Sequence, residues 1–76
     1  MASGKLEQIE LAIIAGGKLT AGMGTDPDGR VWFTGTMTLP ASKGPARRRA
    51  RVWNVDGLAM PVVLANLDRA IGNNPY

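Results

Sequence analysis

The chain has 76 residues, 45% of them hydrophobic and 20% charged, which suits one small domain over 1–76 and is too apolar for a disordered segment. It has no histidine and no cysteine, so the usual general base, the thiolate nucleophile, the common zinc ligands and any disulfide are excluded. The formal net charge of +3 comes from nine basic and six acidic side chains. We therefore expect a protein that is not an enzyme and that needs neither a metal ion nor a cofactor.

Size and hydropathy also bear on assembly and location. A chain this short, without disulfides, has a small core, so association as a homodimer is expected. No apolar run approaches the roughly 20 residues that span a bilayer, and the run at 11–15 is too short for the core of a signal peptide. These features predict a cytoplasmic protein with no membrane partner.

The first element, at about 6–15, fits two structures. A three-residue loop at 16–18 would place Ile9, Leu11 and Ile13 on one face of a strand. Ile9 and Ile13 also fit the spacing of a short N-terminal helix, and Glu, Leu and Ala favour one, although the chain offers no capping box. We expect the strand, and a short helix followed by a three-stranded sheet is the alternative.

The clearest local signal is the turn Asp26-Pro27-Asp28-Gly29. Pro27 and Asp28 suit the central positions of a type I turn and Gly29 suits the left-handed residue after it, which predicts a three-residue hairpin loop with a bulge. The turn accounts for both aspartates, and the remaining calcium ligands are missing. Strands at about 19–25 and 30–39 then share a buried face with the first strand: Ile9, Leu11, Ile13, Leu19, Ala21, Met23, Val31, Phe33, Met37 and Leu39.

The second half of the chain completes the predicted fold. Pro40 ends a strand, and the glycine and prolines around it predict a mobile basic loop over 40–49. A strand at about 50–55 contains Trp53, which we expect in the core. Pro61 suits the first turn of a helix over about 60–72 that covers one face of the sheet. The predicted class is α+β: a four-stranded antiparallel meander at about 6–15, 19–25, 30–39 and 50–55, with one C-terminal helix.

The charge is concentrated in one stretch of nine positions, 43–51. This stretch holds five of the nine basic side chains and no acid, so the rest of the chain has a net charge of 4 − 6 = −2. Four of the five are arginines, which bind phosphate in a bidentate manner and stack on bases. A solvated loop is the simpler interpretation of a charge run, but the arginine bias favours a polyanion. The predicted phosphate ligands are Lys43, Arg47, Arg48, Arg49 and Arg51.

Trp32 and Arg30 extend this candidate surface. The predicted register places Trp32 on the outer face of the sheet, opposite Gly24, beside several threonines. An aromatic ring over strand glycines can simply stabilise a sheet or face another subunit. It can also stack a nucleobase, which contributes about 1–3 kcal/mol.

Two functional hypotheses follow. The order of four antiparallel strands and one helix resembles the single-stranded-DNA-binding transcriptional-coactivator fold, and this resemblance implies dimers that bind through a sheet surface and basic loops. The residues themselves predict a small nucleic-acid-binding protein, with single-stranded DNA or RNA favoured and low sequence specificity, because no helix carries a set of base-reading side chains. The alternative is a small phage- or plasmid-type modulator whose arginine loop binds an acidic protein surface.

Overall fold

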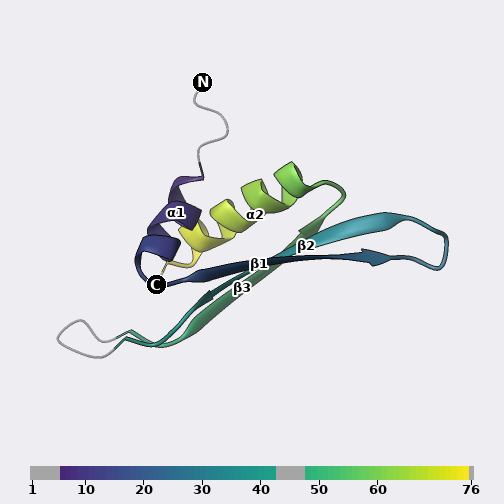
Figure 1. The fold of residues 1–76 in the computed structure, drawn as a ribbon. Coiled ribbons are helices and arrows are strands. Elements are labelled where there is room, and N and C mark those ends of the chain that lie inside the picture. The colour runs from purple at the N-terminus through teal and green to yellow at the C-terminus, as the bar shows by residue number, and fades with distance from the viewer. Residues whose placement is uncertain (1–5, 43–47, 76) are drawn as a thin grey trace, which may run out of the picture.

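The computed structural model describes residues 6–42 and 48–75. Three strands form one antiparallel sheet in the order β1-β2-β3, and both helices pack on the same face of it (Figure 1). In chain order the elements are α1 (Glu7–Ile14), β1 (Lys18–Thr25), β2 (Val31–Leu39), β3 (Arg51–Gly57) and α2 (Met60–Asn73). The fold is α+β, and within the described ranges no helix has the length and apolarity needed to cross a bilayer.

The predicted strand at 6–15 is wrong, and the alternative, a short N-terminal helix, is what the chain forms. Asp68 of α2 explains the difference, because its Oδ1 accepts hydrogen bonds from the N–H groups of Gln8 at 2.8 Å and Ile9 at 3.0 Å. The N–H groups of the first turn of a helix have no partner within the helix. The N-cap residue Leu6 makes no side-chain hydrogen bond to them. The cap therefore comes from a residue sixty positions away. The four-stranded meander, and the resemblance that depended on it, do not hold.

The glycines at 16–17 end α1 rather than forming a hairpin loop. Gly16 has φ of +104°, and its N–H donates to the Ile13 carbonyl while the Gly17 N–H donates to the Ala12 carbonyl. This pair of bonds is the Schellman motif, which satisfies the last carbonyls of a helix. The chain then reverses directly into β1.

The predicted hairpin between β1 and β2 is confirmed in its register. Met23 lies opposite Phe33 and Leu19 opposite Met37. In the turn, the Asp26 N–H donates to the Arg30 carbonyl at 2.8 Å, and Gly29 has φ of +86°. A residue with a side chain is strained at that φ, so the Pro-Asp-Gly sequence selects this loop and with it the register.

The core lies under the two helices, at one end of the sheet. Its fully or nearly buried side chains are Ile9, Ala12, Met37, Leu39, Trp53, Val63, Leu67 and Ile71. Trp53 points into this core as predicted, and its Nε1–H donates to the Asn74 carbonyl at 3.2 Å. Gly35 lets α2 approach β2 closely, since a Cβ at that position would lie 2.7 Å from Val63 Cγ1.

The predicted buried face is wrong at the positions outside this core. Leu11 and Ile13 are exposed on α1, and Met23 and Val31 are exposed on the sheet. α2 packs against β3 and β2. The outer part of the β1–β2 hairpin, from the exposed Met23 to the exposed Val31, is called the distal hairpin, and the hairpin extends beyond both helices on this side (Figure 1). The radius of gyration is 13.9 Å, against about 11 Å for a compact domain of this length. The molecule is elongated, with extents of 50 × 32 × 17 Å.

Candidate nucleic-acid interface

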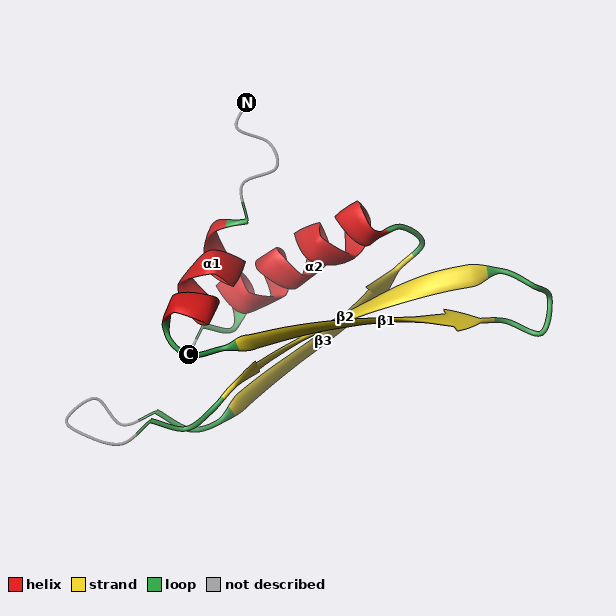
Figure 2. Ribbon diagram, viewed as in Figure 1, coloured by secondary structure: helices red, strands yellow, loops and turns green. Residues whose placement is uncertain are grey.

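Both helices of the described residues lie on one face of the sheet, and within this part of the chain the other face carries no helix (Figure 2). We call it the open face. Strand alternation places on it the side chains of the even-numbered positions, because the odd-numbered Met37, Leu39 and Trp53 point into the core. The open-face residues are Lys18, Thr20, Gly22, Gly24, Trp32, Thr34, Thr36, Thr38, Val52, Asn54 and Asp56.

Trp32 lies across Gly24, as the sequence predicted. A Cβ added to Gly24 would lie 2.3 Å from Trp32 Cζ2 and 2.6 Å from Cε2, so the ring occupies the space that a side chain would fill. The ring is half-buried and therefore keeps part of its surface in contact with solvent. Shielding of a strand glycine and stacking of a base use opposite sides of the same ring, so the two interpretations are compatible.

Small polar side chains occupy the middle of the open face. The Thr36 hydroxyl donates a hydrogen bond to Asn54 Oδ1 at 2.7 Å. A shallow depression of about 390 Å³ lies over this pair, lined by Thr34, Thr36, Asn54, Val55 and Asp56. Its hydroxyl, amide and carboxylate groups can form hydrogen bonds with a polar ligand, while Asp56 adds a negative charge there.

Arg48 is held by the protein itself. Its Nη2 donates to the carbonyls of Ala15 at 3.2 Å and Pro40 at 3.3 Å. Ala15 follows the last turn of α1, where unsatisfied carbonyls favour a cation. The Arg48 carbonyl also accepts from the Ser42 N–H at 2.9 Å. Arg48 thus fastens the chain after β2 to the end of α1.

Arg51 is likewise engaged, on the face that carries the helices. Its guanidinium donates to the carbonyls of Pro75 at 3.2 Å and Asn74 at 3.4 Å. The same group lies 5.4 Å from the centre of the Trp53 ring, a cation–π contact. These contacts hold the C-terminal residues against β3, and they place Arg51 on the side of the sheet away from Trp32.

The predicted site residues do not form one cluster. Arg49 is exposed near the end of the sheet where β3 begins, and Arg30 is exposed at the hairpin turn. The intervening strand, Val31–Leu39, has nine residues. It therefore separates Arg30 and Trp32 at one end of the sheet from Arg49 at the other end by about 30 Å. Lys43 and Arg47 lie outside the described residues.

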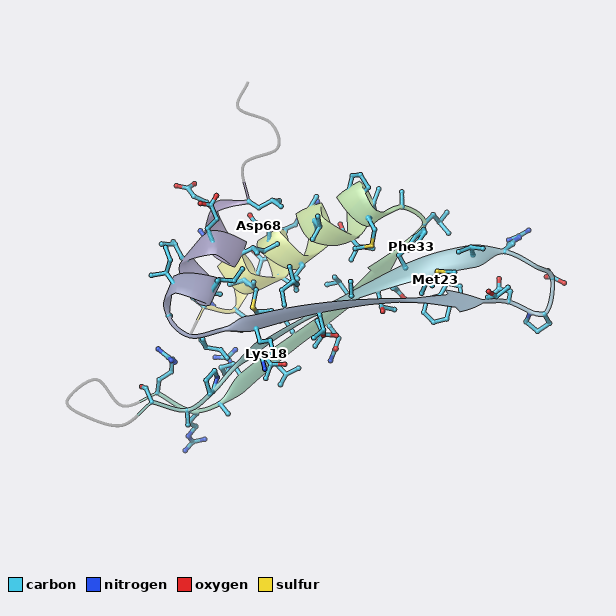
Figure 3. All side chains as sticks on the ribbon, in the orientation of Figure 1. Lys18, Met23, Phe33 and Asp68 are labelled. Carbon is cyan, nitrogen blue, oxygen red and sulfur yellow. The ribbon has the colours of Figure 1, made fainter. Side chains whose placement is uncertain are left out.

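Lys18 is a basic residue of the open face that the sequence-based site did not include. It lies opposite Thr38 at the first position of β1, on the side of the sheet away from the helices (Figure 3). The signal was present, because the hairpin register assigns Lys18 to the same face as Trp32. Asn54 was missed for a different reason, since its role depends on the pairing of β3 with Thr36.

No group of three or more His, Cys, Asp and Glu side chains within the described residues is arranged to hold a metal ion. Comparison with known proteins adds no assignment: no protein-family model, no curated protein and no solved structure matches the chain. The function is therefore argued from the residues of the open face and its two ends.

Proposed function

We propose that the protein binds single-stranded nucleic acid across the open face, with low sequence specificity and without catalysing a reaction. The observation that carries the proposal is the open face itself, a helix-free surface on which Trp32 is partly exposed between glycines and threonines. A flat surface with an accessible aromatic ring accepts any unpaired base, because every base has a π-face. A duplex hides those faces.

The cations at the two ends fit a strand that runs along the sheet. Arg30 lies next to Trp32, and Arg49 lies about 30 Å away at the opposite end, both exposed. Phosphates bound at both ends would place the intervening nucleotides over the threonines and Asn54. Lys43 and Arg47, outside the described residues, contribute to this proposal through their charge only.

The geometry assigns Arg48 and Arg51 a supporting role in this proposal. Both donate hydrogen bonds to backbone carbonyls of the protein, so they are less suited than Arg49 to bind phosphate. They hold the segment that carries Arg49 against α1 and the C-terminal residues.

The test is a titration with a short single-stranded oligonucleotide, a duplex of the same sequence and the corresponding RNA, at two salt concentrations, followed by tryptophan fluorescence. We expect quenching of Trp32, since Trp53 is buried. Arg49→Ala should weaken binding and reduce the salt dependence by about 0.7 in the slope of log K against log salt. Arg69→Ala is the matched control, because Arg69 is an exposed arginine on α2, on the other face of the sheet.

A second variant separates stacking from charge. Trp32→Leu keeps an apolar side chain over Gly24 and removes the π-face, so affinity should fall by about 5- to 150-fold while the salt slope stays unchanged. Because this variant lacks the reporting tryptophan, its affinity is compared with that of the unaltered protein by the fluorescence anisotropy of a dye-labelled oligonucleotide. Equal affinities of the Arg49 and Arg69 variants, or no fluorescence response to any of the nucleic acids at low salt, would contradict the proposal. The acidic protein surface would then be the better candidate partner.

A further inference from the structure

β1 forms an unprotected edge of the sheet. Within the described residues it pairs with β2 on one side and with no strand on the other. Between Leu19 and Thr25 it contains neither proline nor a charged residue, the features that usually prevent edge-to-edge association. The opposite edge, β3, carries Arg51 and Asp56.

The register shows which backbone groups face outward. The Asp26 N–H donates to the Arg30 carbonyl, so the even-numbered positions of β1 direct their N–H and C=O groups toward β2. The odd-numbered positions, Leu19, Ala21, Met23 and Thr25, direct theirs away from it. The backbone N–H and C=O groups of these four alternate residues are thus available to another strand.

Exposed apolar side chains lie near both ends of the same strand. Leu11 and Ile14 on α1, before β1 begins, are 48% and 80% exposed, and Met23 and Val31 on the distal hairpin are 67% and 42% exposed. Met23 and Phe33 lie together on the helix side of the sheet, toward the hairpin turn (Figure 3). An antiparallel pair of β1 strands would bring α1 of each copy to the distal hairpin of the other.

We propose that the protein forms a symmetric homodimer in which β1 pairs antiparallel with β1 of a second copy. The two-fold axis passes beside Gly22, perpendicular to the sheet. Leu19 then lies opposite Thr25 of the second copy and Ala21 opposite its Met23. The axis keeps the helices of both copies on one side, so the two three-stranded sheets become one sheet of six strands.

Charge and hydrogen bonding both select this register. It places Lys18 opposite Asp26 of the second copy, and two-fold symmetry forms this pair twice. All four outward-facing residues of each β1 find partners, and each hydrogen-bonded pair exchanges two bonds. With Ala21 on the axis instead, Thr25 loses its partner and Lys18 faces a glycine.

The proposed pairing can bury the surface area that a specific dimer requires. A specific dimer buries about 800 Å² per partner, which is about 15% of the accessible surface of 5378 Å². β1 alone has eight residues and so spans about 27 Å, and α1 against the distal hairpin adds contact at both ends. The dimer does not depend on nucleic-acid binding, although a six-stranded sheet would place both open faces side by side.

Cysteine crosslinking tests the axis directly, because the chain has no cysteine of its own. In this register Gly22 faces itself in a non-hydrogen-bonded pair, with Cα atoms about 4.5 Å apart, a separation that a disulfide can bridge. Gly22→Cys should give a disulfide-linked dimer under mild oxidation. Its new Cβ lies 3.1 Å from Thr34 Oγ1, which needs only a small shift of that hydroxyl. Thr20→Cys, on the same strand and face, is four residues out of register with its counterpart and should remain uncrosslinked.

Charge exchange provides a second test that leaves the backbone intact. Lys18→Glu alone should raise the dimer dissociation constant, measured by sedimentation or light scattering, by about tenfold, since the change acts at two symmetric pairs. Lys18→Glu combined with Asp26→Lys should restore the dissociation constant. A monomeric mass of the unaltered protein, or a dimer that Gly22→Cys does not crosslink, would overturn the proposal, and so would a double variant as weak as the single one.

Discussion

At the residue scale, arginines that the sequence does not distinguish have different roles in the structure. Arg48 and Arg51 donate hydrogen bonds to backbone carbonyls, while Arg49 and Arg30 are exposed. A guanidinium that satisfies the carbonyls at a helix end stabilises the fold and is correspondingly less available to a phosphate. Composition cannot separate these roles, because the role of each arginine depends on the groups that lie next to it in the folded chain.

Asp68 is the residue whose role is easiest to measure. Its Oδ1 accepts from two N–H groups in the first turn of α1, so Asp68→Ala should reduce the free energy of unfolding by about 1 kcal/mol. Urea denaturation followed by circular dichroism gives this value. Asp68→Asn is the matched control, because its amide oxygen still accepts a hydrogen bond, and most of the stability should remain. An alanine variant as stable as the unaltered protein would show that α1 needs no cap.

At the scale of elements, α1 depends on its two ends. Its first turn is capped from α2 and its last turn is closed by Gly16 and Gly17, while only Ile9 and Ala12 of its eight residues are buried. An isolated helix of this length is marginal in water. α1 is therefore stabilised by its contacts with α2 and the sheet rather than by its own sequence.

Two glycine-to-alanine substitutions test this account in opposite directions. Gly16→Ala introduces a side chain at φ of +104° with no neighbour within 4 Å, so backbone strain alone should destabilise the fold by about 1 kcal/mol. Gly72 lies within α2, and a Cβ there would meet Gln8 Cγ at an ordinary 3.5 Å. Gly72→Ala should stabilise by about 0.5–1 kcal/mol, since alanine favours a helix. Thermal unfolding should therefore shift down for the first variant and up for the second, and a shift of the same sign in both would contradict this account.

At the scale of the whole molecule, the elongated shape is the main finding. The distal hairpin extends beyond the core and leaves Met23 and Val31 exposed. A small monomeric domain does not need such an extension in order to fold. The exposed apolar side chains and the unprotected β1 edge are explained together if the core is completed by a second copy.

This view predicts an unfolding temperature that depends on protein concentration. A tenfold increase in concentration should raise the midpoint by roughly 3–6 °C, because dimer formation stabilises the folded state by mass action. Ala21→Pro, which removes an outward N–H of β1, should abolish this dependence. Val52→Pro is the matched control, since Val52 directs its N–H away from β2 on the opposite edge. A midpoint that stays constant over a hundredfold range in concentration would argue for a stable monomer.

Local chemistry determined what the sequence alone could predict. The Pro-Asp-Gly turn determines the β1–β2 register, because the three-residue hairpin loop requires a residue at positive φ and Gly29 supplies it. That register assigns Trp32 to the open face opposite Gly24. The proline at the start of α2 and the helical spacing of its apolar residues likewise determine the C-terminal helix. All of these signals lie within a few residues of the structure they determine.

Tertiary structure decided the rest. Residues 7–14 have a pattern that suits a strand or a helix, and the contacts with α2 and the sheet, including the cap from the distant carboxylate of Asp68, favour the helix. The positions of α1 and α2 on the sheet determine that Met37 is buried and Met23 exposed, although both lie on the same face of the sheet. The physical reason is common to both cases: burial and long-range hydrogen bonds depend on which segments meet in space, and the free energy of those contacts exceeds weak local preferences.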